Sequence, residues 1–215
     1  MLATSAVAQT PPSLAEIARY NGLHAAAARG WHGGVPELII NGLDPNIRDQ
    51  NDRTPLHVAA FHGHTETMRA LVQGGADPNA LDKQKYDIVT ILAVKDDPRN
   101  LEVALQLGCD PRNVTSPWSG TALIAAAHLG HDEVVRILIK AGAPLDHVNS
   151  LHWTALIESI VLGDGGLRHT ASLKALVDAG ADVNLADAQG RTPLRLARER
   201  GYSEMVDILE KAGAR

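Results

Sequence analysis

Ten histidines are the side chains of this 215-residue chain whose type suits a metal ion. Two pairs, His62 with His64 and His128 with His131, have spacings that metal ligands use. The other histidines are scattered along the chain, and no HExxH or paired-cysteine pattern accompanies any of them. The sequence therefore predicts neither a metal site nor a cofactor.

Hydrolytic chemistry would need a nucleophile placed beside a base, and the sequence offers no such pattern. There is no GxSxG motif, no setting for a Cys/His dyad around the single Cys109, and no pair of carboxylates within one motif. The run Gly163-Asp164-Gly165-Gly166 lacks the lysine of a phosphate-binding loop. We therefore predict a protein without catalytic activity.

The composition excludes further classes of protein. A formal net charge of −5 and an isoelectric point of about 6.0 argue against a nucleic-acid partner. No stretch approaches the roughly 18 apolar residues that a membrane span requires, so we expect no membrane insertion. One cysteine cannot form an internal disulfide. Aromatic residues make up only 3% of the chain, which favours a core of thin helix–helix layers.

The stretch Asp49–Ala80 shows which secondary-structure elements must position the histidines and the other candidate side chains. Thr54 is a good N-cap, and Pro55 follows it at the first helical position, where its missing N–H does no harm. Gly63 suits a helix end that needs a positive φ. The apolar residues within Met68–Gln73 recur with helical spacing and indicate a second helix.

Weaker copies of this stretch recur with a period near 33 residues. The copies, with their TPLH-like starts and Gly-Ala-Asp ends, resemble the ankyrin repeat, a helix–turn–helix unit with a projecting β-turn. The resemblance implies an all-α solenoid of about six helix–turn–helix units with projecting β-hairpin loops. The units are expected at residues 13–48, 49–81, 82–114, 115–148, 149–186 and 187–215.

The resemblance also gives four histidines structural roles. His24 and His57 hold the slot whose ring, in this family, ties neighbouring hairpins together by hydrogen bonds. His64 and His131 hold the Gly-His turn slot between the two helices of a repeat.

Two repeats depart from the pattern. In the third repeat Asp87 replaces the N-cap threonine, and we place one extra residue just before the helix at Leu101–Leu107. In the fifth, the spacing from Thr154 to Thr192 is five residues longer than the period. We expect the extra residues to form a loop, Asp164–Ser172, between the two helices.

Residues 1–12 precede the repeats, and two interpretations of them stay open. Ala6-Val7-Ala8 is a small-x-small pattern of the kind that signal peptidases cut, although the positive region is missing. A signal-peptide remnant would indicate a periplasmic or secreted bacterial protein. If residues 1–12 are instead a disordered tail, we expect a cytoplasmic protein.

The resemblance implies a protein partner, bound by a monomer on the concave face that hairpin tips and first helices form. Tryptophan at a hairpin tip is typical of a binding anchor, which favours Trp118 and Trp153, although Trp153 could instead pack over its neighbouring hairpin. The candidate contact residues are Phe61, His62, Tyr86, Trp118, His128, His152, Trp153, Glu158, Asp164, Arg168 and His169.

Glu158 stands in a slot that is apolar in most other repeats, so its carboxylate is either paired or functional. We expect it to pair with Arg195 or Arg198 of the next repeat. The alternative function is a small-ligand or metal site in the groove of repeats four and five, built from His128, His152, Glu158 and His169.

Overall fold

The computed structural model describes residues 9–215, and the predictions made for residues 1–8 lie outside this range. The described residues form thirteen α-helices and one short 3₁₀ helix, without a named strand. The helices are α1 (Leu14–Ile17), α2 (Gly22–Arg29), η1 (His32–Gly34), α3 (Val35–Ile40), α4 (Pro55–His62), α5 (Thr65–Gln73), α6 (Ile88–Val94), α7 (Pro98–Gln106), α8 (Ala122–Leu129), α9 (Asp132–Lys140), α10 (Ala155–Val161), α11 (Leu167–Asp178), α12 (Pro193–Arg200) and α13 (Ser203–Lys211).

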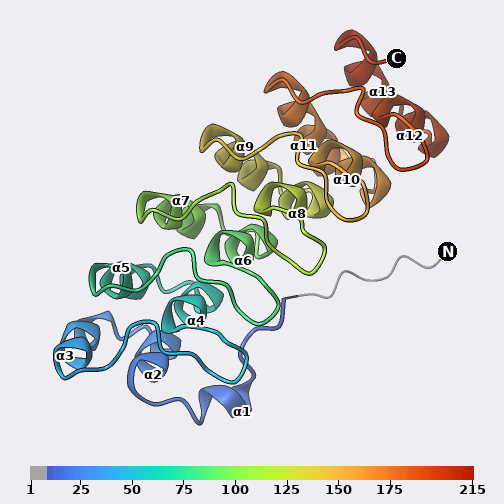
Figure 1. Cartoon of the computed structure of the whole chain (residues 1–215). Coiled ribbons are helices and arrows are strands. Elements are labelled where there is room, and N and C mark those ends of the chain that lie inside the picture. The colour runs from blue at the N-terminus through green and yellow to red at the C-terminus, as the bar shows by residue number, and fades with distance from the viewer. Residues whose placement is uncertain (1–8) are drawn as a thin grey trace.

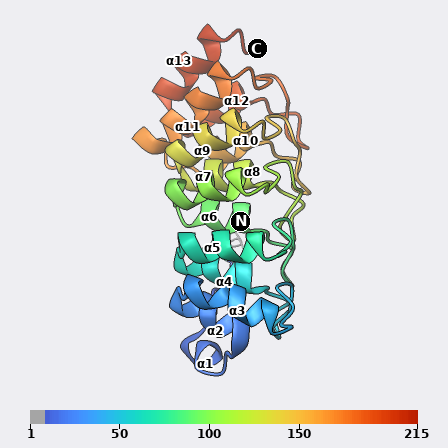
Figure 2. The same ribbon diagram turned by 90° about the vertical axis from the view of Figure 1, so that its left-hand side faces the viewer.

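After α1, the helices stack as antiparallel pairs into an elongated array (Figure 1). The first helices of the pairs pack on one another in one layer, and the second helices pack in another. The loops that join successive pairs all project to the same side (Figure 2). The predicted all-α solenoid with projecting hairpin loops is confirmed.

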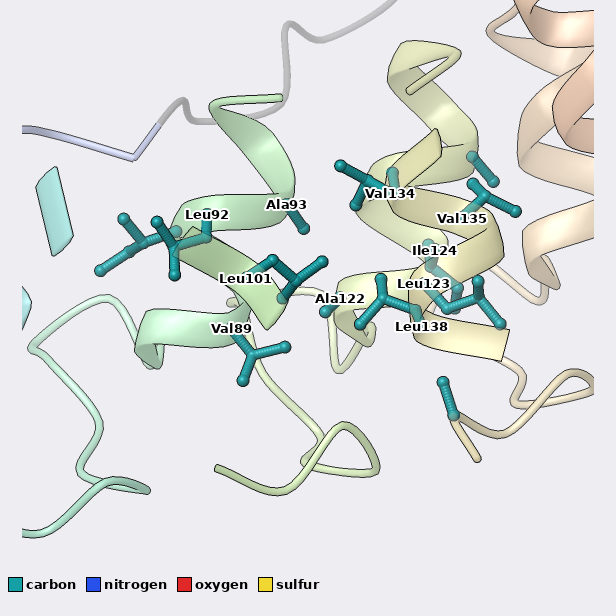
Figure 3. Close-up of a cluster of buried hydrophobic side chains, with 14 of the residues drawn as sticks. Val89, Leu92, Ala93, Leu101, Ala122, Leu123, Ile124, Val134, Val135 and Leu138 are labelled. Carbon is teal, nitrogen blue, oxygen red and sulfur yellow. The ribbon is translucent and has the colours of Figure 1, made fainter. Parts of the chain in front are cut away.

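Buried aliphatic side chains hold neighbouring pairs together. Figure 3 shows the cluster between α6–α7 and α8–α9, in which Leu92, Leu101, Leu123 and Leu138 have no exposed surface. Alanines on the first helices let adjacent helices approach closely, and Ala126 is also fully buried. Each pair therefore buries its two faces only against its neighbours, as a solenoid requires.

The loop before each first helix is a tight hairpin, and we number it by the repeat it begins. The hairpins are two (Asp49–Arg53), three (Asp82–Tyr86), four (Thr115–Gly120), five (Asn149–Trp153) and six (Asp187–Arg191), each closed by a bond from its first N–H to its last carbonyl at 2.8–3.0 Å. Neighbouring tips are joined as well, because Ser116 donates its N–H to the Lys85 carbonyl and Ser150 to that of Trp118, both at 2.9 Å.

Histidines tie the hairpins to the preceding repeats, as the resemblance implied. The Nδ1 of His57 accepts the backbone N–H of Thr54 at 3.1 Å, which leaves Nε2 to donate to the Tyr86 carbonyl at 3.2 Å. In the first repeat, His24 contacts the Arg53 carbonyl in the same way at 2.9 Å. The predicted N-cap at Asp87 is also confirmed, since its carboxylate accepts the Thr90 N–H at 2.8 Å.

A second set of side chains starts from the turn between the two helices of a repeat. These side chains bond to carbonyls near the end of the first helix in the preceding repeat. His64 reaches Ala28, His131 reaches Ala93 and His169 reaches His128, at 2.8–3.2 Å. Carbonyls at the end of a helix lack a full set of partners within the helix, so these bonds help to satisfy the helix ends. Lys95 makes a similar bond from repeat three to the Ala60 carbonyl, and Tyr202 makes one from repeat six to the Gly163 carbonyl just beyond α10.

Two predicted insertion sites are wrong in detail. Leu167–Ser172 belongs to α11, which is longer than the other second helices, so the loop is confined to residues 162–166. The residue placed before Leu101–Leu107 lies instead in the segment between α7 and α8. Hairpin four takes it up, since Thr115 pairs with a residue five positions later, whereas Asp49 and Asn149 pair with residues four positions later.

Candidate partner-binding surface

Trp118 stands at the tip of hairpin four, with 36% of its surface exposed. The extra residue of this hairpin is accommodated at Ser116, which adopts a positive φ of 68°, whereas the positive φ of Ser119 recurs at the matching position of the other hairpins. The Ser116 hydroxyl accepts the N–H groups of Trp118 and Gly120, both at 3.3 Å. The indole is therefore presented by a locally fixed backbone.

Exposed apolar side chains accompany Trp118 on hairpins four and five. Val114, Val148 and Leu151 are 51, 46 and 40% exposed. Sequence reasoning missed them, although the signal was present, because the matching slots hold Arg48 in hairpin two and Gln189 in hairpin six. We call Val114, Trp118, Val148 and Leu151 the apolar tip patch.

The other aromatic candidates lie deeper. Tyr86 is only 6% exposed and belongs to the buried core. Phe61 and Trp153 are half-buried and pack against that core. The alternative interpretation, in which Trp153 packs against its surroundings, therefore describes this side chain better than a freely exposed residue at a hairpin tip.

Glu158 is buried, with 3% of its surface exposed, and its partners differ from those expected. One carboxylate oxygen lies 3.1 Å from Nδ1 of His128, and the other accepts the Asn149 side-chain amide at 2.9 Å. The predicted pairing with Arg195 or Arg198 is wrong. Those arginines lie on the exposed face of α12, where nearer carboxylates on their own repeat engage them.

Arg195 bonds to Glu199 at 2.8 Å, and Arg198 bonds to Glu210. His128, by contrast, stands near the end of α8 and reaches across the repeat boundary to Glu158 on α10. Its side chain remains 29% exposed, so the pair presents an imidazole at the surface with a buried carboxylate behind it.

The remaining histidine candidates lie at opposite ends of the helix pairs. His152 is exposed at the tip of hairpin five, with a φ of 60°. His62 is exposed at the end of α4 and stacks on His64, with ring centroids 5.8 Å apart. Partial burial, then the neighbouring His64 and Lys95, lower the pKa of His62.

Asp164, Arg168 and His169 lie at the turn end of repeat five, one helix length from the hairpins. Arg168 bonds to Asp96 of repeat three at 2.7 Å and to Asp132 of repeat four at 3.3 Å. The Gly166 backbone N–H and His169 lower the pKa of Asp164. His169, held by Asp164 at 2.8 Å, fills the structural turn slot described above.

Among the described residues, no three His, Cys, Asp or Glu side chains come together as a metal site would require. Of the four residues in the alternative groove site, only His128 and Glu158 bond through their side chains, and His169 reaches only the His128 carbonyl. No helix in residues 9–215 has the length and apolar character of a membrane span.

Stacked helix pairs with linked hairpins and an exposed apolar tip patch define a helical repeat protein of the solenoid class. A family model described as "Ankyrin repeats (3 copies)" matches residues 23–111 and 90–187. The chain belongs to the ankyrin repeat family, whose members generally serve as protein–protein interaction modules.

Relatives and solved structures agree with this assignment. The chain is 39% identical over 103 residues to the putative ankyrin repeat protein YahD of Escherichia coli K12, a match that covers 47% of this chain and 51% of that protein. The chain thus spans about half of that relative's length. An ankyrin repeat domain from Acinetobacter baumannii is similar with a TM-score of 0.84 and 38% identity, over 90% of this chain and 98% of that one.

The ankyrin repeat domain of Bcl-3, described as a member of the IkappaB protein family, is similar with a TM-score of 0.82 and 26% identity. That match covers 92% of this chain and 88% of the other.

Proposed function

We propose that the chain is a non-catalytic module that binds a protein partner on the concave face of repeats four to six. The observation that carries this proposal is the apolar tip patch, which includes Trp118. Large apolar side chains gathered on adjacent exposed tips are a feature of protein interfaces, and tryptophan is enriched among the residues that dominate binding energy.

Two histidines on the same repeats would supply polar contacts to a partner. His152 is exposed on the same hairpin as Leu151, and His128 presents its imidazole on the neighbouring first helix. A partner would bury the tryptophan and meet these histidines as well.

Hairpin four is also preorganised for binding. Its backbone bonds to hairpin three through Ser116 and to hairpin five through the Trp118 carbonyl, which accepts both the N–H and the hydroxyl of Ser150. A surface that is ordered before association loses less conformational entropy on binding.

The test is affinity capture by the full-length chain from an extract of the source organism, followed by mass spectrometry. A Trp118→Ala/Leu151→Ala variant removes two exposed side chains of the patch. Trp31→Ala is the matched control, because Trp31 is 56% exposed but lies in repeat one. We expect a protein that the wild type and the control retain and the double variant loses. A partner retained by the double variant and lost by the control would refute the proposed surface.

A further inference from the structure

We propose that the hairpin side of repeats two and three is a second peptide-docking surface, which the chain's own residues 9–17 occupy. We call these residues the N-terminal strap. A partner could bind the hairpin side of repeats two and three only after the strap has dissociated from it. The inference rests on the proposed function, because it presumes a partner for the concave face.

The strap crosses hairpins two and three through polar contacts. The Thr10 N–H donates to the side-chain carbonyl of Gln84 at 3.3 Å, and the Thr10 carbonyl accepts from the Arg53 guanidinium at 3.2 Å. The Glu16 carboxylate accepts from Arg53 and, at 2.7 Å, from the Asn51 amide. Figure 1 shows this part of the chain leaving α1 along the hairpin side of the array.

Hairpin six offers an internal comparison with hairpin two. Arg53 and Arg191 hold the same slot, and each bonds through Nε to the aspartate that opens its hairpin, at 2.8 Å in both cases. Side-chain exposure nevertheless differs, at 1% for Arg53 and 33% for Arg191. The strap bonds to Arg53, whereas the polar partners of Arg191 among the described residues are side chains of its own repeat. Hairpin three also flanks hairpin two, while hairpin six is the last of the array, so the strap accounts for part of this difference in exposure. Without the strap, the Arg53 guanidinium would lose its bonds to Thr10 and Glu16.

The chemistry of these contacts identifies what the surface accepts. The strap supplies a backbone N–H, a backbone carbonyl and a carboxylate, and the hairpins supply two side-chain amides and a guanidinium. Pro11 and Pro12 fix φ and favour an extended chain over the hairpins. Guanidinium groups bind carboxylates and carbonyls strongly. The matching partner is therefore an acidic peptide segment, extended before a short helical turn as in the strap itself.

The Gln9 end of the strap is poorly satisfied. Gln9 is only 8% exposed, yet neither polar atom of its side-chain amide has a hydrogen-bond partner among residues 9–215. A buried amide without partners disfavours the bound state. The strap is thus anchored at Glu16 and weakly held at Gln9, as a displaceable segment would be.

The experiment uses full-length proteins and, as probe, a fluorescein-labelled peptide of residues 9–20 (QTPPSLAEIARY), with binding followed by fluorescence anisotropy. In the wild type, the tethered strap competes at a high effective concentration, so we expect weak binding. A release variant, Thr10→Pro/Glu16→Ala, disrupts the strap but leaves the hairpins unchanged. We expect it to bind the probe at least about tenfold more tightly than the wild type.

Hairpin variants locate the binding. Adding Gln84→Ala and Asn51→Ala to the release variant should abolish probe binding. Adding Gln189→Ala should not, because Gln189 holds the same slot in hairpin six. The single Thr10→Pro variant keeps the Glu16 anchor, so it should bind with intermediate affinity, and it remains informative if the double variant folds poorly.

Equal probe affinity for the wild type, the Thr10→Pro variant and the release variant would overturn the proposal. Binding that survives the Gln84→Ala and Asn51→Ala changes would overturn it too. Trp118→Ala should leave probe binding unchanged, so this result is separable from the capture experiment on the apolar tip patch.

Discussion

Glu158 is a buried carboxylate in a slot that holds Val58, Ile91 and Leu196 in other repeats, all of them buried. Removing one member of a buried polar contact leaves its partners unsatisfied and is destabilising. We therefore expect Glu158→Leu to lower the free energy of unfolding by about 2–5 kcal/mol, because both His128 and the buried Asn149 amide lose this partner. His128→Ala should lower it by about 1–3 kcal/mol, because the carboxylate then keeps only its amide partner.

Urea denaturation of both variants at pH 7, with the wild type alongside, measures the two losses. If Glu158→Leu is as stable as the wild type, the contact does not stabilise the fold, and the buried carboxylate would have to be explained by a role in binding.

His57 makes the fold sensitive to acid. Burial lowers the pKa of its imidazole to about 4, so the ring is neutral in the folded chain at pH 7. In the unfolded chain the ring takes up a proton near pH 6.5, and stability therefore falls as the pH drops from 6.5 towards 4. Between pH 7 and pH 5 this residue should account for a loss of about 2 kcal/mol.

Urea titrations at the two pH values measure that loss. His57→Gln has an amide in place of the ring and takes up no proton in this range. Between pH 7 and pH 5 the variant should therefore lose about 2 kcal/mol less stability than the wild type. An unchanged pH dependence in the variant would mean that other groups govern the acid response.

At the scale of elements, Arg168 links α11 to two earlier repeats. Its contacts with Asp96 and Asp132 are partly exposed, and such ion pairs contribute only about 0–1 kcal/mol to stability. We expect Arg168→Gln to change the urea midpoint little. Hydrogen exchange at the start of α11, residues 167–170, should nevertheless become faster, because local opening no longer breaks these contacts. Lys174→Gln, which removes an exposed pair within α11, is the matched control.

The helix pairs could be predicted from sequence because each carries its own local signals, such as the Thr54-Pro55 start and the apolar stripe of α5. The insertions could not be placed, because a change in spacing gives a residue count and no location. The extra residue near repeat three could lie in either neighbouring loop, and hairpin four took it up where Ser116 adopts a positive φ.

Site residues were harder to predict because their environments depend on contacts between repeats. Trp118 could be placed from its hairpin position. The partner of Glu158 could not, since His128 lies 30 residues earlier and the arginines of the next repeat offered a more obvious opposite charge. His169 looked free because the five-residue insertion hid its turn slot, which the bond to the His128 carbonyl reveals.

At the scale of the whole molecule, the repeats pack mainly on their immediate neighbours, with the Arg168–Asp96 pair as an exception that spans two repeats. Position along the array should therefore decide how far a defect spreads. Leu123 on α8 and Met205 on α13 have no exposed surface, and truncating either to alanine should cost about 2–5 kcal/mol locally. α8 packs against repeats on both sides, whereas α13 packs only on α11 and α12.

Leu123→Ala should therefore weaken the central repeats and lower the stability of the whole array. Met205→Ala should instead release α12 and α13, while α6–α9 remain folded. Hydrogen exchange with mass spectrometry distinguishes the two patterns, because only the first variant should lose protection in α6–α9. If Met205→Ala accelerates exchange equally in α6–α9, the repeats unfold as one cooperative unit, and the array lacks the end-to-centre gradient in stability that its contacts predict.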